Sequence, residues 1–370
     1  MKNLQFLCLL ILLSVSLAAC SASGTPPAST TLVGGTPGNT QRDTVSASTA
    51  IGNFHEYPLP QGNDGMMRPA VDREGRVWFG EMNRNYLAVF DPRTRAFRQM
   101  TPPHGHYGIM GVAVAGDDSI WFAEQYANYI GHYLPATGRY QTYPLPTITV
   151  PDPSNAGKTL TLPVAPNDLA IDVQGIVWFT EMNADAIGRL DPHSGHLRHY
   201  PISARRSAQT LNPYGVTIDP RGMVWFTESS TNRVGQLDPA TGSIHFFSTP
   251  GAGNLMELAS DSRGTLWLTS FRDDLLLSLN PRTGTFTPYY APSSGSGTGG
   301  LYGLAVTPAG EVWITVPAEN VIAHLDITAH RFIYYHIPTT SSFPLGIAID
   351  NHQHLWFTES GSNKVGMLQP

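Results

Sequence analysis

The stretch Val216-Thr-Ile-Asp-Pro-Arg-Gly-Met-Val-Trp-Phe-Thr-Glu228 decides the fold, because close copies of it occur elsewhere in the chain. Leu169-Ala-Ile-Asp-Val-Gln-Gly-Ile-Val-Trp-Phe-Thr-Glu181 and Ile347-Ala-Ile-Asp-Asn-His-Gln-His-Leu-Trp-Phe-Thr-Glu359 repeat the same order of residues. Every tryptophan of the chain marks one such unit, at positions 78, 121, 178, 225, 267, 313 and 356. A period of about 40–50 residues is typical of a four-stranded propeller blade. We therefore predict an all-β, seven-bladed β-propeller of four-stranded antiparallel blades.

Each unit contains four short β-prone segments, here named strands a to d. In the unit around Trp225, strand a ends at Ile218-Asp219, strand b is Val224–Glu228 and strand c is Arg233–Asp238. Asp-x-x-Gly joins a to b and Asp-Pro-x-Thr-Gly joins c to d, since Pro and Gly suit the central positions of tight turns. No segment shows a sustained helical period, so no helix is predicted.

The two ends of the repeat region complete one blade. The last unit stops after strand c, at Leu368-Gln-Pro370, and Phe54-His-Glu-Tyr-Pro-Leu-Pro60 is a strand d without its a, b and c. Pairing these segments removes two exposed sheet edges. We predict that the propeller spans residues 51–370 and is closed by the N-terminal strand pairing with the C-terminal blade.

The first fifty residues predict export. Lys2 and the apolar run Phe6–Leu17 are typical of a signal peptide. Leu17-Ala-Ala-Cys20 resembles the bacterial lipobox, in which the cysteine is lipidated; an ordinary cleavage site is the alternative. The following residues are rich in Ser, Thr, Gly and Pro and carry few large apolar side chains, as in disordered segments. We expect 1–19 to be a lipoprotein signal peptide and 20–50 a lipidated tether, giving an exported cell-envelope lipoprotein anchored through Cys20.

The charge balance limits the kinds of partner that we expect. The formal net charge is −6 with 14% charged residues, and no Lys/Arg cluster tracks a phosphate backbone, which argues against nucleic acid. We expect a monomer with a small-molecule, glycan or peptide ligand. The b–c and d–a loops share one end of the propeller, called the top face, where the longer loops predict the binding site. These loops are Leu145–Pro166, Ile202–Asn212 and Pro292–Gly300.

Side chains that recur in most units are predicted to be scaffold. An acid stands three residues after Trp at Glu81, Glu124, Glu181, Glu228 and Glu359, and Asn or Asp stands seven after it in all seven units. Acceptance of backbone N–H bonds in the b–c loops is the favoured interpretation. The alternative is a carboxylate ring that holds Mg²⁺ or Ca²⁺.

Departures from the repeat are better site candidates. Ten residues before Trp, four units have glycine, whereas the others have Arg68, Asp168 and Glu257. The preceding position carries Asn167, Tyr214 and Tyr302 among methionines and a leucine, a mixture that suits a small organic ligand. With Arg272 in a b–c loop, we predict a ligand-binding set of Arg68, Asn167, Asp168, Tyr214, Glu257, Arg272 and Tyr302. The alternative is that Arg68 pairs with the acids and closes the channel.

Two histidines of the d–a loop Thr101–Gly108 are the catalytic candidates. His104 and His106 lie on the predicted functional face, and histidine can exchange a proton near neutral pH. Solvated loop histidines are the alternative. No nucleophile elbow, phosphate loop, zinc-spaced His/Cys set or EF-hand loop occurs in the sequence.

The repeated Trp-Phe-Thr-Glu…Asn-x-Ile/Val-Gly-x-Leu unit resembles the streptogramin (virginiamycin B) lyase family, from about residue 51 to 370. The architecture is more distantly similar to the SMP-30/gluconolactonase propellers. The resemblance implies opening of a cyclic depsipeptide by elimination, assisted by Mg²⁺, with a catalytic histidine in the last blade. That position holds Leu345, the second expected histidine is Tyr302, and Phe343 replaces an acid. Leucine takes no proton, so this elimination cannot run from Leu345.

Three functions remain open at this point. The first is a cell-envelope propeller that binds a ligand on its top face. The second is a Mg²⁺-dependent carbon–oxygen lyase or lactone hydrolase acting on cyclic depsipeptides or lactones. The third is a non-catalytic interaction scaffold, favoured by a channel that an Arg68–Asp168–Glu257 cluster closes together with a broad apolar patch elsewhere.

Overall fold

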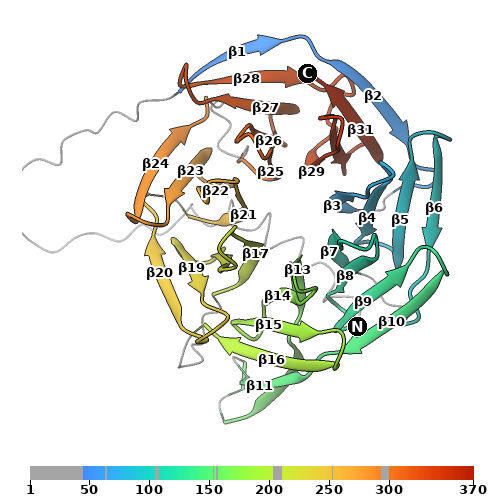
Figure 1. The fold of residues 1–370 in the computed structure, drawn as a ribbon, viewed down its shortest axis with the longest axis vertical. Coiled ribbons are helices and arrows are strands. Elements are labelled where there is room, and N and C mark those ends of the chain that lie inside the picture. Colours follow the sequence, from blue (N-terminus) through green and yellow to red (C-terminus); the bar gives the residue numbers. More distant parts are fainter. Residues whose placement is uncertain are drawn as a thin grey trace, which may run out of the picture. The chain divides into compact units, whose positions relative to one another are not determined.

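A computed structural model of the chain describes residues 45–62, 65–104, 108–152, 154–155, 157–202, 211–251, 253–292 and 300–370. Within these ranges all regular structure is β, and no helix that could span a membrane is found. Seven small sheets are arranged in a ring (Figure 1). The predicted seven-bladed β-propeller is therefore confirmed.

Each blade is a four-stranded antiparallel meander. Blades 1 to 3 are β3 (Met66–Val71), β4 (Val77–Glu81), β5 (Tyr86–Asp91), β6 (Ala96–Met100); β7 (Ile109–Val114), β8 (Ile120–Glu124), β9 (Tyr129–Leu134), β10 (Arg139–Pro144); and β13 (Pro166–Ile171), β14 (Val177–Glu181), β15 (Ala186–Asp191), β16 (His196–Pro201). Blades 4 and 5 are β17 (Pro213–Ile218), β18 (Val224–Glu228), β19 (Arg233–Leu237), β20 (Ile244–Ser248); and β21 (Leu255–Ser260), β22 (Leu266–Ser270), β23 (Leu275–Asn280), β24 (Thr285–Tyr290).

Blades 6 and 7 carry the closure. Blade 6 is β25 (Leu304–Val306), β26 (Val312–Val316), β27 (Val321–Asp326), β28 (Arg331–His336), and blade 7 is β29 (Pro344–Ile349), β30 (Leu355–Glu359), β31 (Lys364–Gln369) with β2 (Asn53–Pro58). β2 pairs antiparallel with β31, from Asn53 opposite Gln369 to Pro58 opposite Lys364. The predicted closure of the ring is confirmed.

One strand lies where a disordered tether was predicted. β1 (Ser46–Ala50) pairs in parallel with β28 and makes blade 6 five-stranded. Val45, just before it, is 2% exposed and packs in the core of that blade. The ordered chain thus begins before residue 51, because backbone pairing on a free strand edge needs no apolar pattern. The rest of the segment 1–50 lies outside the described residues.

The first strands of the blades surround the axis. Each contacts the first strand of the next blade, and β29 contacts β3, so they form a closed inner ring (Figure 1). The insertion Leu145–Pro166 forms the hairpin β11 (Thr147–Pro151) and β12 (Thr159–Pro163). β11 lies at the periphery of the ring, and Ile148 packs between blades 2 and 3. This insertion therefore supports a blade junction and does not cover the channel.

The tryptophans pack at the junctions between blades. Their repeated partner is the aspartate of the Asp-x-x-Gly turn, whose carboxylate accepts the indole N–H and backbone N–H groups of its own turn. For Asp219 the indole bond from Trp225 is 3.1 Å long. The same bond joins Asp72 to Trp78, Asp172 to Trp178 and Asp350 to Trp356. The turn motif is thus tied to the core residue that follows it.

Candidate functional site

A β-bulge positions the candidate ligand-binding residues. In six blades the first strand loses register over two residues, such as Asn167 and Asp168 between the paired Pro166 and Leu169. These two residues stand eleven and ten before Trp, the positions where the candidate ligand-binding residues depart from the repeat. Bulges reorient side chains and are common beside functional sites. The departures from the repeat therefore coincide with a departure from regular pairing.

Threonine side chains satisfy the backbone groups that the bulges release. Thr180 accepts the Asp168 N–H of its own blade at 3.1 Å and donates to the Tyr214 carbonyl of the next blade at 3.0 Å. The same two bonds are made by Thr227, Thr269, Thr315 and Thr358. Gly80 and Ala123 occupy this position in blades 1 and 2. These threonines recur two residues after Trp, a signal that our sequence analysis missed.

Three charged residues from three blades meet in the channel. Arg68 Nε and Nη2 each lie 2.6 Å from Glu257 Oε1, and Nε lies 3.7 Å from Asp168 Oδ1. The three side chains keep 10–11% of their surface exposed. The carboxylates outnumber the guanidinium, so the cluster has one negative charge in excess when both acids are ionised. Here it is called the channel cluster.

Glycine in the neighbouring blades makes room for this cluster. A Cβ on Gly111 would lie 3.0 Å from Asp168 Oδ1, and one on Gly346 would lie 2.7 Å from Arg68 Cα. Likewise, a Cβ on Gly215 would lie 2.8 Å from the Met256 carbonyl, beside Glu257. Each charged residue therefore follows a blade that has glycine at the same position. Glycine at these positions is therefore a steric requirement of the close approach of the next blade's backbone.

Aromatic, amide and thioether groups surround the channel cluster. The Tyr214 and Tyr302 hydroxyls share a hydrogen bond, and the Arg68 guanidinium lies over the Tyr214 ring, 4.9 Å from its centroid. Asn167 donates to the Tyr214 carbonyl at 3.0 Å and accepts from Gln125 at 3.3 Å. A buried apolar group adjoins the tyrosines: Met67, Met110 and Met256, with Met82, Met182, Phe271 and Leu345 packed against it. The structure thus brings together six of the seven predicted ligand-binding residues.

Burial and the neighbouring opposite charges shift the pKa of these groups. It raises the pKa of the Asp168 and Glu257 carboxyls, although the nearby Arg68 opposes the change. Burial alone would lower the pKa of Arg68, but the two acids raise it well above its ordinary value. Burial also raises the pKa of the Tyr214 and Tyr302 hydroxyls. The guanidinium is therefore permanently charged, and the tyrosines stay neutral donors.

The remaining predicted site residues lie elsewhere or outside the described residues. Arg272 is exposed on the b–c loop of blade 5. His104 lies against the outer strand of blade 2, where Nε2 is 3.0 Å from Thr142 Oγ1 and the ring stacks on Tyr129. His106 lies outside the described residues. His104 is thus a packed side chain on blade 2 and not a member of the channel cluster.

Three of the recurring acids are paired with side chains of the third or fourth strand of their own blade. Glu81 accepts from Gln99 at 2.7 Å, Glu181 lies 2.7 Å from His199 Nδ1, and Glu228 binds Arg233. These pairs support the scaffold interpretation, but with side-chain donors in place of the expected backbone groups. Glu124 differs, because it is 1% exposed and neither carboxylate oxygen has a hydrogen-bond partner in the part of the chain that the structure describes. Burial raises its pKa to about 7.

The recurring Asn and Asp residues organise the top-face loops. Asn128 donates to the Leu145 and Pro146 carbonyls at 2.9 Å, and its amide oxygen accepts the Ala165 N–H. Asn320 makes the equivalent bonds in blade 6. Asn128, Asp185, Asp274, Asn320 and Asn363 have positive φ values, a conformation that Asn and Asp tolerate well. These residues are scaffold.

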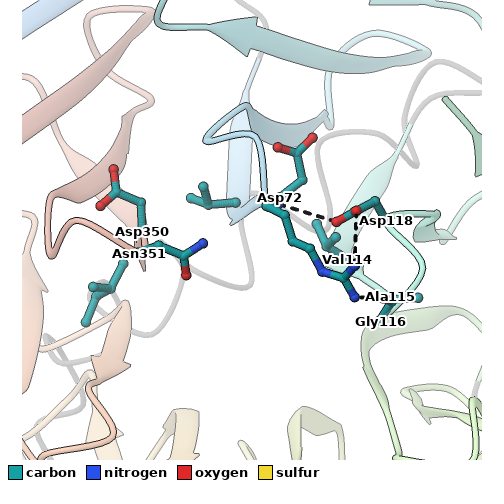
Figure 2. Close-up of a pocket in the computed structure, with 10 residues that line it drawn as sticks. Asp72, Val114, Ala115, Gly116, Asp118, Asp350 and Asn351 are labelled. Atoms are coloured by element: carbon teal, nitrogen blue, oxygen red, sulfur yellow. Dashed lines mark hydrogen bonds and ion pairs between the residues drawn. The ribbon is translucent and has the colours of Figure 1, made fainter. Parts of the chain in front are cut away.

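A cavity of about 210 Å³ lies at the opposite, bottom end of the channel. It is lined by the a–b turns of blades 7, 1 and 2, with Asp72 and Asp350 facing it from two sides (Figure 2). Both carboxylates are already saturated: Asp350, for example, accepts from the His352 and His354 backbone, the His354 ring and the Trp356 indole. Arg73 is likewise engaged with Asp118 and the Gly116 carbonyl. This cavity is a by-product of the turns.

Two of the three positions implied by the family resemblance, Leu345 and Phe343, are apolar. Leu345 lies at the edge of the methionine group and gives its carbonyl to Thr315. Phe343 is 44% exposed with φ of 48°. The residue before strand a also has positive φ in five other blades, at Gly65, Gly108, Ala165, Asn212 and Asn254. The described residues contain no group of three metal-ligating side chains.

Comparisons with known proteins support the resemblance. The model of the Virginiamycin B lyase family matches residues 205–370. The virginiamycin B lyase from Staphylococcus aureus is 23% identical, with 86% of this chain and 99% of that chain covered at a TM-score of 0.74. A streptogramin B lyase gives the same identity and TM-score, with 86% and 97% covered. Hydrazine synthase of Kuenenia stuttgartiensis is 13% identical at a TM-score of 0.67, covering 84% and 97%. No curated protein sequence matches the chain.

Proposed function

We propose that this chain, a streptogramin-lyase-like β-propeller, is an exported, lipid-anchored protein that binds a small molecule, glycan or peptide where its channel opens on the top face. The channel cluster is the observation that carries this proposal. Burying charged side chains costs desolvation free energy, and four blades have glycine at the same position. The fold therefore does not require Arg68, Asp168 and Glu257, which favours a role in recognition.

The same fold binds an organic ligand in a solved relative. A catalytically inactive histidine-to-alanine variant of the Staphylococcus aureus virginiamycin B lyase has been solved with quinupristin. That protein is 22% identical to this chain, so it supports binding by the architecture and says nothing of the ligand here. The methionine and tyrosine side chains beside the channel cluster offer a soft apolar surface, and methionine adapts well to irregular ligands.

The residues present do not fit a Mg²⁺-assisted depsipeptide lyase. Leu345 and Tyr302 stand where the resemblance implies histidines, and Phe343 stands where it implies an acid. The Glu359 carboxylate accepts from Ser362 at 2.8 Å and shares a buried environment with Glu56. Neither a proton-accepting histidine nor a set of free carboxylates is therefore available at that place. We derive no lyase step for this chain.

The scaffold alternative is supported by one of its two criteria. The Arg68–Glu257 pair crosses the channel between blades 1 and 5, as that alternative requires. The large exposed apolar side chains of the described residues, however, lie in separate turns and loops, for example Tyr126, Val173 and Ile327. A broad apolar docking patch is therefore not formed by these residues.

A fragment screen tests ligand binding directly. Methyl NMR of the purified protein should show fragments that shift the methionine methyls of Met67, Met110 and Met256, whereas Met223 and Met367 in the blades should not move. A library of small molecules, glycans and peptides that leaves the channel methionines unchanged would overturn the proposal. A Mg²⁺-dependent depsipeptide-opening assay is expected to show no turnover, and His104→Ala should not alter fragment binding.

Export and anchoring are tested by fractionation. Lys2, the run Phe6–Leu17 and Cys20 after Leu-Ala-Ala support a lipoprotein signal. Cys20→Ala should move the protein from the membrane fraction to the soluble extracytoplasmic fraction, because the lipid would have no attachment point. Retention of the variant on the membrane would contradict lipidation at Cys20.

A further inference from the structure

The channel cluster contains both a hydrogen-bond donor and acceptors whose bonding capacity is not fully used. Arg68 Nη1 is buried and has no hydrogen-bond partner among the described residues, and the residue as a whole is 9% exposed. On the acidic side, Asp168 Oδ2 accepts the Val216 N–H at 2.9 Å, and no side chain of the described residues donates a hydrogen bond to Asp168. Among the described residues, Glu257 accepts side-chain hydrogen bonds only from Arg68.

Such incomplete pairing requires an explanation. Buried polar groups in folded proteins are almost always hydrogen-bonded, and a partly satisfied network is less favourable than an apolar core. The bottom carboxylates show that this fold can saturate a buried acid, since Asp219 accepts from Trp225, two backbone N–H groups and Arg221. The channel cluster therefore lacks partners that an occupant of the channel would supply.

The excess negative charge of the channel cluster favours a positively charged ligand. Two carboxylates face one guanidinium, and charges interact strongly where water is scarce. A positively charged donor compensates the excess, and the Tyr214 and Tyr302 rings add surfaces that attract cations. The methionine group Met67, Met110 and Met256 would lie against the apolar remainder of the ligand. An oxygen next to the positive centre would accept from Arg68 Nη1.

We propose that the channel cluster binds an organic ammonium ion that carries an adjacent carbonyl and an apolar body, the chemistry of an α-amino amide or a peptide N-terminus. The ammonium donates to the acceptor positions of Asp168 and Glu257 that Arg68 leaves unused, the carbonyl oxygen accepts from Arg68 Nη1, and the apolar body contacts the methionines. This inference rests on the proposed ligand-binding function and names the ligand class.

Calorimetry with three probes tests the inference on the purified protein. Phenylalanine amide has the ammonium, the carbonyl and the apolar ring; phenethylamine lacks the carbonyl; N-acetylphenylalanine amide lacks the charge. We expect phenylalanine amide to bind most tightly, phenethylamine several-fold more weakly, and the acetylated probe at least about tenfold more weakly, because hydrogen bonds to charged groups are the strong ones. Equal affinity for the acetylated probe would overturn the inference.

Two variants separate the channel cluster from general charge effects. Asp168→Asn keeps an acceptor for the Val216 N–H and should weaken phenylalanine amide binding at least about tenfold. Asp118→Asn removes the same charge at the bottom mouth of the channel and should leave the affinity unchanged. An unchanged affinity in Asp168→Asn would contradict the inference.

Methyl NMR of the wild-type protein keeps the test decisive even if a variant fails to fold. Phenylalanine amide should shift the methyls of Met67, Met110 and Met256. If no ammonium probe shifts them while neutral or anionic fragments do, the ligand class is wrong and the proposed function stands. If nothing shifts them, both fail.

Discussion

Buried carboxylates at the two ends of the channel differ in how fully their oxygens are hydrogen-bonded. At the bottom, the aspartate of the Asp-x-x-Gly turn is held by an indole N–H and by backbone N–H groups of its own turn, and the arrangement recurs at Asp72, Asp172, Asp219 and Asp350. At the top, Asp168 and Glu257 occur once each and share one guanidinium. The repeated aspartates of these turns are saturated and structural, whereas the two channel carboxylates, which occur once each, have acceptor capacity to spare.

We expect the largest loss of thermal stability from a change that opens the ring of blades. Deleting residues 51–60 removes β2, leaves β31 as an open edge and removes the aromatic contacts that Phe54 and Tyr57 make with blade 7. We expect the melting transition to fall by more than about 10 °C or to lose cooperativity. Differential scanning calorimetry measures this. Deleting residues 45–50, which form a fifth strand on a complete blade, should have a smaller effect; an unchanged melting temperature without β2 would contradict the closure.

A pair of aspartate variants contrasts the mouths directly. Asp219→Ala leaves the Trp225 indole and two backbone N–H groups without acceptors, so we expect a loss of about 4 kcal/mol in unfolding free energy. Asp168→Asn should cost less than about 1 kcal/mol, because the amide oxygen still accepts the Val216 N–H. Urea unfolding followed by tryptophan fluorescence gives both values. Equal losses would show that the two mouths do not differ.

Glu124 makes the top side of blade 2 sensitive to pH. Burial raises its pKa from 4.5 to about 7, so the folded state binds the proton more tightly than the unfolded state. Its contribution is complete at low pH and is lost as pH rises from about 4.5 to about 7. Glu124→Gln should recover up to about 3 kcal/mol above pH 7, since one pKa unit corresponds to 1.36 kcal/mol. Stability curves from pH 4 to 8 test this, with exposed Glu74→Gln as the control that should follow the wild type.

The threonines that join neighbouring blades give a smaller effect. Thr227→Val removes the donor to the Met256 carbonyl at 2.7 Å and the acceptor of the Gly215 N–H at 3.0 Å. We expect a loss of about 2 kcal/mol, because two buried backbone groups lose their partners. Chemical denaturation measures it. The control is Thr227→Ser, which keeps the hydroxyl that makes both bonds; an equal loss in the two variants would contradict the bonding role.

The fold could be predicted because the physical requirements repeat. Trp, Asp-x-x-Gly and the closing strand each satisfy the same packing or hydrogen-bonding need in most blades. β1 could not be predicted, because Ser46–Ala50 pairs through its backbone and buries only Val45 beside it. The channel residues were found as departures from the repeat, but not the bulges that bring them together. The position of His104 could not be predicted, because its contacts with Thr142 and Tyr129 of blade 2 leave no signal in the repeat.

One triple variant tests most directly whether the channel cluster serves recognition and not folding. Arg68→Met, Asp168→Asn and Glu257→Leu together replace the charges by groups of similar volume, a change that is often neutral or stabilising for buried ion clusters. Melting temperature and phenylalanine amide affinity are measured on the same sample. Our account predicts an unchanged or higher melting temperature and loss of binding. A melting temperature lowered by more than about 10 °C would show that the cluster is structural and contradict the account.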